Sequence, residues 1–131
     1  DRISDLRPLS ALTNLKVLNL SWNSITSLTE LEALTNLTYL VLDNNQISDL
    51  QPLSGLTNLT ELDLHDNQIS DLQPISNLTN LTVLGIRNNQ ITSLAGLENL
   101  TNLTYIYASG NPLTDTSALE VSGCMNALYT G

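Results

Sequence analysis

The chain is short, acidic and dominated by three residue types. Its 131 residues carry 4 basic and 13 acidic side chains, for a formal net charge of −9, and Leu, Asn and Thr supply 60 positions. This charge disfavours binding to nucleic acid or to an anionic membrane, and no apolar run approaches the ~20 residues that span a bilayer. The single cysteine, Cys124, excludes an internal disulfide framework and a cysteine-rich zinc site.

A period of 22 residues organises the sequence. Five leucines, each preceded by Thr-Asn, keep this spacing without slippage: Leu15, Leu37, Leu59, Leu81 and Leu103. The period predicts one repeat domain over residues 1–131. It consists of a partial repeat (1–14), four full repeats (15–36, 37–58, 59–80 and 81–102), a degenerating repeat (103–124) and a partial strand (125–131).

Each repeat is predicted to start as a short strand and to return through tight turns. Leu18 and Leu20 are two residues apart, which is the spacing of a strand with one buried face. Apolar residues between Ile47 and Leu59 are spaced by three, which favours a 3₁₀-like segment. Three repeats place a proline at one phase of this segment, which argues against a continuous α-helix there: Pro8, Pro52 and Pro74. Stacked repeats would pair their strands in a parallel sheet.

An asparagine recurs after each strand, where the chain must turn inward. The series keeps the 22-residue period: Asn23, Asn45, Asn67, Asn89 and Asn111. An amide side chain offers two donors and one acceptor, so it can satisfy backbone groups of its own turn and of the next one. We predict a structural asparagine ladder, not a ligand site.

The repeat pattern L-x-x-L-x-L-x-x-N-x-I-x-x-L-x-x-L-x-x-L-x-x resembles the 22-residue class of leucine-rich repeats. The segments LTNLTYLVLDNNQISDLQPLSG and LTNLTELDLHDNQISDLQPISN are most similar to bacterial internalin-type proteins. Phosphatase-regulatory leucine-rich repeat proteins share the period and are a second relative. The resemblance implies a right-handed, curved solenoid of the α/β class, with a concave parallel sheet and 3₁₀-like convex segments. It also implies protein binding by the concave face, in a secreted or surface-attached bacterial protein.

Residues that alternate with the buried leucines should point outward from the concave face. All five aromatic residues of the chain fall on this surface: Trp22, Tyr39, Tyr105, Tyr107 and Tyr129. Exposed Tyr and Trp are enriched at interface hot spots, although both also suit strands by propensity alone. We predict that these aromatic side chains contact a partner.

Charged residues on the same surface complete the predicted partner-binding set: Asp43, Glu61, Asp63, His65 and Arg87. Gly85 is expected between Asp63 and Tyr107, where it would leave a dip suited to a side chain of the partner. A carboxylate–imidazole metal site on this strand is conceivable, but a solvated acidic patch is the commoner arrangement. We therefore expect no metal and no cofactor. We also expect no catalysis, because the only His and the only Cys lie far apart in the repeat order.

The sequence thus predicts a non-catalytic, protein-binding module that does not bind nucleic acid or insert into a membrane. The alternative is a structural or self-associating segment that stacks through uncapped ends. No polar cap precedes Leu6, Leu9 and Leu12, and Thr116 and Ser122 stand where leucines belong. We expect a processed product or a fragment that is monomeric or associates weakly end to end.

Overall fold

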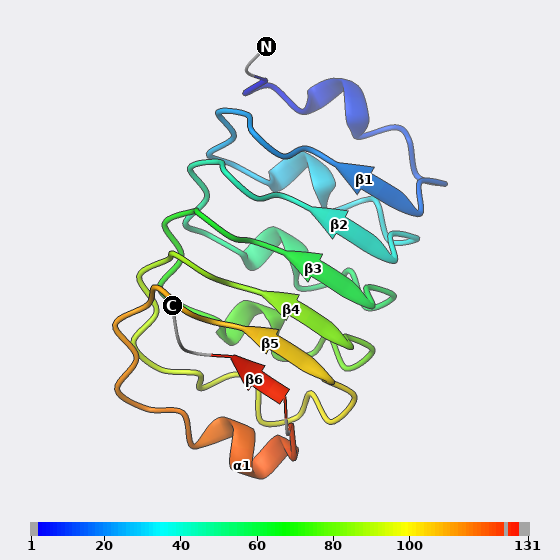
Figure 1. The fold of residues 1–131 in the computed structure, drawn as a ribbon. Coiled ribbons are helices and arrows are strands. Elements are labelled where there is room, and N and C mark those ends of the chain that lie inside the picture. The colour runs from blue at the N-terminus through cyan, green and yellow to red at the C-terminus, as the bar shows by residue number, and fades with distance from the viewer. Residues whose placement is uncertain (1–2, 125, 129–131) are drawn as a thin grey trace.

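Parallel strands stack in sequence order along one side of the molecule (Figure 1). The computed structural model describes residues 3–124 and 126–128. Its strands are β1 (Val17–Asn19), β2 (Tyr39–Val41), β3 (Glu61–Asp63), β4 (Val83–Gly85), β5 (Tyr105–Tyr107) and β6 (Asn126–Leu128). From β1 to β5, each residue pairs with its equivalent one repeat later, as in Val17 with Tyr39. The predicted parallel-sheet solenoid is confirmed.

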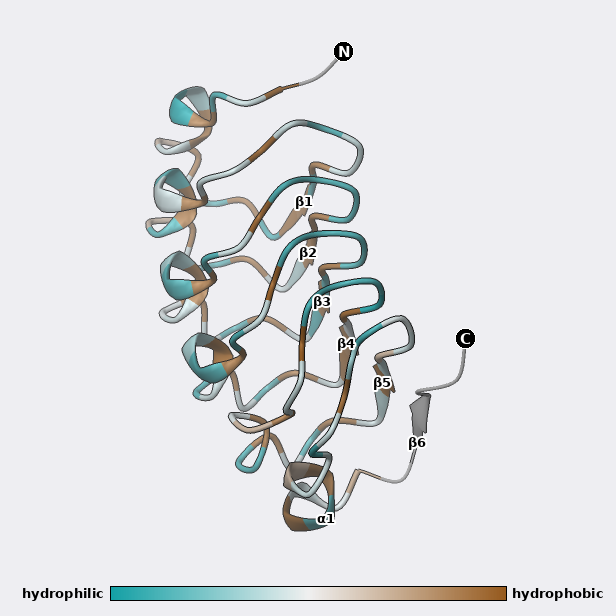
Figure 2. Ribbon diagram, turned by 90° about the vertical axis from the view of Figure 1, so that its left-hand side faces the viewer, coloured by the Kyte–Doolittle hydropathy of each residue, from teal (hydrophilic) through white to brown (hydrophobic). Residues whose placement is uncertain are grey.

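Short 3₁₀ helices line the opposite side of the solenoid (Figure 2). They are η1 (Arg7–Leu9), η2 (Thr29–Leu31), η3 (Gln51–Leu53) and η4 (Gln73–Ile75). A proline occupies the start of η1, η3 and η4, where its missing N–H removes no helical hydrogen bond. Along the stacking axis, each 3₁₀ turn is wider than the spacing between strands, which is about 4.8 Å. The stack therefore curves, with the sheet on its concave side.

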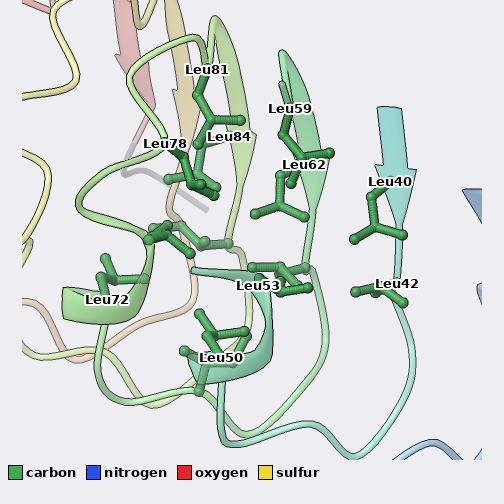
Figure 3. Close-up of a cluster of buried hydrophobic side chains, with 14 of the residues drawn as sticks. Leu40, Leu42, Leu50, Leu53, Leu59, Leu62, Leu72, Leu78, Leu81 and Leu84 are labelled. Carbon is green, nitrogen blue, oxygen red and sulfur yellow. The ribbon is translucent and has the colours of Figure 1, made fainter. Parts of the chain in front are cut away.

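A continuous core of leucine and isoleucine fills the space between the sheet and the 3₁₀ turns (Figure 3). Leu40, Leu62 and Leu84, the central residues of three neighbouring strands, are at most 1% exposed. Each fully buried leucine side chain contributes about 1.5–3 kcal/mol relative to exposure. Because the same column is filled in every repeat, each turn covers the apolar face of the previous one.

The recurring asparagines join each turn to the one before it, not to the next one as the sequence predicts. Asn67 is 8% exposed, and its Nδ2 donates to the carbonyls of Leu64 (3.1 Å) and of Leu42 in the preceding turn (3.0 Å). Its Oδ1 accepts from the N–H of Ile47, also in the preceding turn, at 3.0 Å. Asn45, Asn89 and Asn111 make the corresponding bonds in their own turns. Asn23 makes two of them, with Leu20 and Ile3.

A second asparagine ladder runs along the turns that precede the strands, and the sequence reasoning did not foresee it. In four of the five Thr-Asn pairs, the asparagine donates to a threonine carbonyl one turn back, at 2.8–2.9 Å. The donors are Asn36, Asn58, Asn80 and Asn102, and the acceptors are Thr13, Thr35, Thr57 and Thr79. Two polar ladders therefore fix the register between neighbouring repeats.

The turn after β5 departs from the pattern. It returns through an α-helix, α1 (Ala118–Ser122), which ends at Gly123 with a left-handed φ of 81°. The chain then reaches the sheet one residue early, because Tyr105 pairs with Asn126 and Ile106 with Ala127. A continued 22-residue period would instead place Ala127 beside Tyr105. The return through α1 thus uses one residue fewer than each return between β1 and β5.

Candidate protein-binding face

Two columns of side chains alternate with the buried leucines on the concave sheet. The first column is Val17, Tyr39, Glu61, Val83 and Tyr105, and the second is Asn19, Val41, Asp63, Gly85 and Tyr107. The leucine or isoleucine between them on β2 to β5 is buried, while Tyr39 and Tyr105 remain 41% and 44% exposed. The backbone thus holds ten side-chain positions in a rigid grid, and their identities vary from one strand to the next.

Aromatic side chains gather on β5. The rings of Tyr105 and Tyr107 stack with centroids 6.3 Å apart and planes inclined by 13°. The guanidinium carbon of Arg87 lies 5.0 Å from the centroid of Tyr107. A cation over a tyrosine face at an exposed site is favourable by about 0.5–1 kcal/mol. Tyr107 is therefore held in place from two directions, which lowers the entropy it would lose on binding a partner.

Trp22 lies in the turn after β1, not in a strand. Its φ of 59° is left-handed, as in the equivalent residues Asn44, Asp66 and Asn88 of the following turns. Asn and Asp tolerate this region, whereas a bulky residue there is costly. The indole is nevertheless 67% exposed, so burial does not compensate for the strain.

Acidic side chains occupy the middle of the concave face. Asp63 is half-buried, and burial raises its pKa, as do the negative charges of Asp43 and Asp66. His65 lowers the pKa of Asp63 in two ways: its backbone N–H donates to the carboxylate, and its imidazole supplies a nearby positive charge when protonated. Across residues 3–124, basic and acidic side chains pair only at Arg7 with Asp5 and at His65 with Asp63, and the second pair is ionic only when the imidazole is protonated. The carboxylate of Glu61 has no basic partner from that part of the chain.

His65 reaches across to the next strand. Its Nδ1 accepts a hydrogen bond from the backbone N–H of Arg87 at 2.9 Å. In the neutral form the ring proton is therefore on Nε2, which lies 3.5 Å from Oδ1 of Asp63. A Cβ on Gly85 would come within 2.5 Å of this ring, so only glycine leaves room for it. The sequence predicted neighbours of opposite charge for His65, but not this contact with the backbone of Arg87.

A hollow of about 160 Å³ opens in the middle of the concave face. Its walls come from four strands and the turn after β3: Tyr39, Glu61, Leu62, Asp63, His65, Val83, Gly85 and Tyr107. It lies where the sequence predicts a dip at Gly85, and part of that dip is filled by the His65 ring.

Half of the predicted partner-binding residues line this hollow. These are Tyr39, Glu61, Asp63, His65 and Tyr107. Asp43 and Arg87 follow the neighbouring strands, Trp22 lies in the turn after β1, and Tyr105 lies on the same strand as Tyr107. Tyr129 lies outside the described residues. Val83 also lines the hollow, although it is not in the predicted partner-binding set. Its place in the first column could have identified it.

Within residues 3–124 and 126–128, no group of three or more His, Cys, Asp or Glu side chains is arranged to hold a metal ion. None of the helices in the same range combines the length and the apolar character needed to cross a membrane.

Comparison with known proteins identifies the repeat. The sequence matches the family "Leucine Rich repeats (2 copies)" at residues 13–55, 35–77 and 79–121. No protein of curated function gives a significant match. Leucine-rich repeat proteins are generally protein-interaction modules and are typically not enzymes.

Solved structures from two bacteria share the fold. An internalin (inlF) of Listeria monocytogenes superposes with a TM-score of 0.94 at 35% identity, over 99% of this chain and 38% of the internalin. Internalin C2 of the same species gives 0.83 at 35% identity, over 98% of this chain and 67% of its own. A leucine-rich repeat protein of Leptospira interrogans gives 0.80 at 33% identity, over 86% and 30%. This chain, which spans well under half of two of these proteins, belongs to the leucine-rich repeat family and is of the internalin type.

Proposed function

We propose that the chain binds a protein partner through its concave face and performs no catalysis. The observation that carries the proposal is the placement of unlike side chains on a nearly invariant frame. Aromatic and acidic residues occupy the two concave columns around one hollow, whereas the convex side repeats Gln-Pro-Leu and its variants. Rigid display of this kind favours binding, because little side-chain or backbone freedom is lost.

We further propose an extracellular or cell-surface location in a bacterium. The support is the similarity to internalins of Listeria monocytogenes and to a protein of Leptospira interrogans, both bacterial species. The aromatic side chains would supply most of the affinity. The acidic residues would mainly speed the encounter with a basic partner, so that added salt slows association.

The test requires a partner captured with the intact chain from a mixture of extracellular proteins, followed by kinetic measurements on purified variants. Tyr107→Ala is expected to weaken binding by about 30-fold or more, because truncation of an aromatic hot spot costs ~2 kcal/mol or more. Gln51→Ala on η3 removes an exposed side chain from the convex side and should leave the affinity unchanged. Loss of binding in Gln51→Ala, with Tyr107→Ala unaffected, would place the interface on the convex side.

Self-association through the first turn is a second candidate function. Ile3 and Leu12 are 45% and 47% exposed there, whereas the leucines equivalent to Leu12 in later repeats are buried. The same variants separate the two candidates, since stacking of first turns would not respond to Tyr107→Ala on β5. Light scattering at millimolar concentration measures the stacking directly.

A further inference from the structure

The hollow in the concave face is the size of one side chain. At about 160 Å³ it is smaller than pockets for drug-sized ligands, which span about 300–1,000 Å³. It opens onto the face proposed above to bind a protein, and the inference that follows rests on that proposal. A hollow of this size suits a single side chain of the partner.

The charge of the hollow selects the kind of residue. Glu61 and Asp63 contribute two carboxylates to its wall, and the only basic ring in the lining is His65. Arg87 is not in the lining, and its guanidinium lies over Tyr107. Burial raises the pKa of Asp63, which means that its negative charge is poorly solvated where it stands. A cation in the hollow would replace the lost solvation.

The remaining wall suits a long side chain with a planar end. Tyr39, Val83 and Tyr107 line the hollow beside the carboxylates and offer apolar and aromatic surface. An arginine can lay its methylene stem along apolar groups, and its guanidinium both forks onto carboxylates and packs on tyrosine rings. Lysine offers a point charge without the planar fork. Arg87 on Tyr107 is an example of guanidinium packing within this same face.

We propose that the hollow receives an arginine side chain of a protein partner, with its guanidinium against Glu61 and Asp63. The stem then lies between Tyr39 and Val83. The arginine enters from the concave side, so it is the residue that fixes the register of the partner on the sheet.

The test titrates the intact chain with N-acetylarginine amide and follows its backbone amide signals by NMR. We expect saturable shifts confined to Glu61, Asp63, His65 and Gly85. N-acetylcitrulline amide has the same shape without the charge, and it should bind at least about tenfold more weakly, since a charge-assisted hydrogen bond is worth about 1.5–3 kcal/mol. Nα-acetyllysine amide, which has a positive charge but no planar guanidinium, should bind with an affinity between those of the arginine and citrulline probes.

Matched variants separate the hollow from the general acidity of the chain. Glu61→Gln and Asp63→Asn should each weaken the arginine probe about tenfold. Asp66→Asn removes the same charge from a turn outside the hollow, at a position where both neighbouring repeats have Asn, and should have less than about a twofold effect.

Three results would overturn the proposal. They are equal binding of the citrulline probe, an equal effect of Asp66→Asn and Asp63→Asn, and no saturable shift at tens of millimolar probe. Any of these leaves the concave-face proposal standing, because that proposal depends on Tyr107→Ala and Gln51→Ala with a whole partner. Conversely, loss of partner binding only in Gln51→Ala would show that the concave face is not the interface, even if the arginine probe binds.

Discussion

The asparagine turn and the concave face come from the same repeat, but their residues do different work. The asparagine position is filled identically in five turns, and its side chain bonds to backbone groups of two turns, as Asn67 does. The first concave column holds valine, tyrosine and glutamate in turn, and those side chains stand in solvent or at the rim of the hollow. A position that satisfies its neighbours cannot vary, and a position that faces a partner can. Stability and recognition should therefore respond to different substitutions.

Asn67→Ala is the change expected to have the largest effect on stability. It removes the acceptor for the Ile47 N–H and the donor for the carbonyls of Leu42 and Leu64. Buried polar groups left without partners cost about 1–3 kcal/mol each, so the free energy of unfolding should fall by about 3 kcal/mol. Urea denaturation measures the loss. Asn77→Ala, at an exposed position after η4, is the matched control and should be close to neutral. Similar losses in the two variants would remove the distinction between ladder and surface asparagines.

Trp22→Asn should act in the opposite direction and more weakly. It installs at φ 59° the residue found in the equivalent turns at Asn44 and Asn88, which tolerates the left-handed conformation. We expect the free energy of unfolding to rise by about 1 kcal/mol, visible as a higher thermal midpoint. Trp22→Tyr keeps a bulky side chain and should not stabilise the protein. A less stable Trp22→Asn variant would mean that the indole packs favourably enough to outweigh its backbone strain.

Asp63→Asn should have the smallest effect and should depend on pH. Burial raises the pKa of Asp63 in the folded protein, so its ionised form opposes folding. This penalty is absent below the pKa of the group in the unfolded chain, grows as the pH rises from that pKa to the higher folded-state pKa, and is complete above the latter. Asp63→Asn should then be more stable than the parent at pH 7, by less than about 1 kcal/mol because solvent screens a half-exposed group. The thermal unfolding midpoints of Asp63→Asn and of the parent should converge in acid. A gap that instead widens at low pH would contradict the direction of the shift.

The sheet register from β1 to β5 could be predicted because the repeat contains no insertion over that range. Once Leu15 and Leu37 are aligned, Val17 must fall beside Tyr39, and every later strand follows by the same step. The register of β6 could not be predicted in this way. The leucine period is broken at Thr116 and Ser122, and an α-helix fills the return.

The candidate site was predictable as a set of columns but not as a set of contacts. Nothing in the spacing of His65 says that its ring lies over the neighbouring strand. That direction depends on the missing Cβ of Gly85 and on the position of the Arg87 N–H. The left-handed backbone at Trp22 was predictable from the aligned residues of the other turns, which are Asn, Asp and Gly. A tryptophan considered by itself does not indicate that conformation.

The walls of the hollow come from four consecutive strands, so no single repeat contains it. Duplication, deletion or exchange of a whole 22-residue unit would preserve the leucine core and both asparagine ladders, because each unit needs only an equivalent neighbour. The same event between β2 and β5 would separate Tyr39, Glu61 and Tyr107 and abolish the hollow, or would assemble a new one from other strands. In this architecture unequal recombination can change what is recognised in one step without destabilising the fold, so ligand specificity can evolve faster than the scaffold.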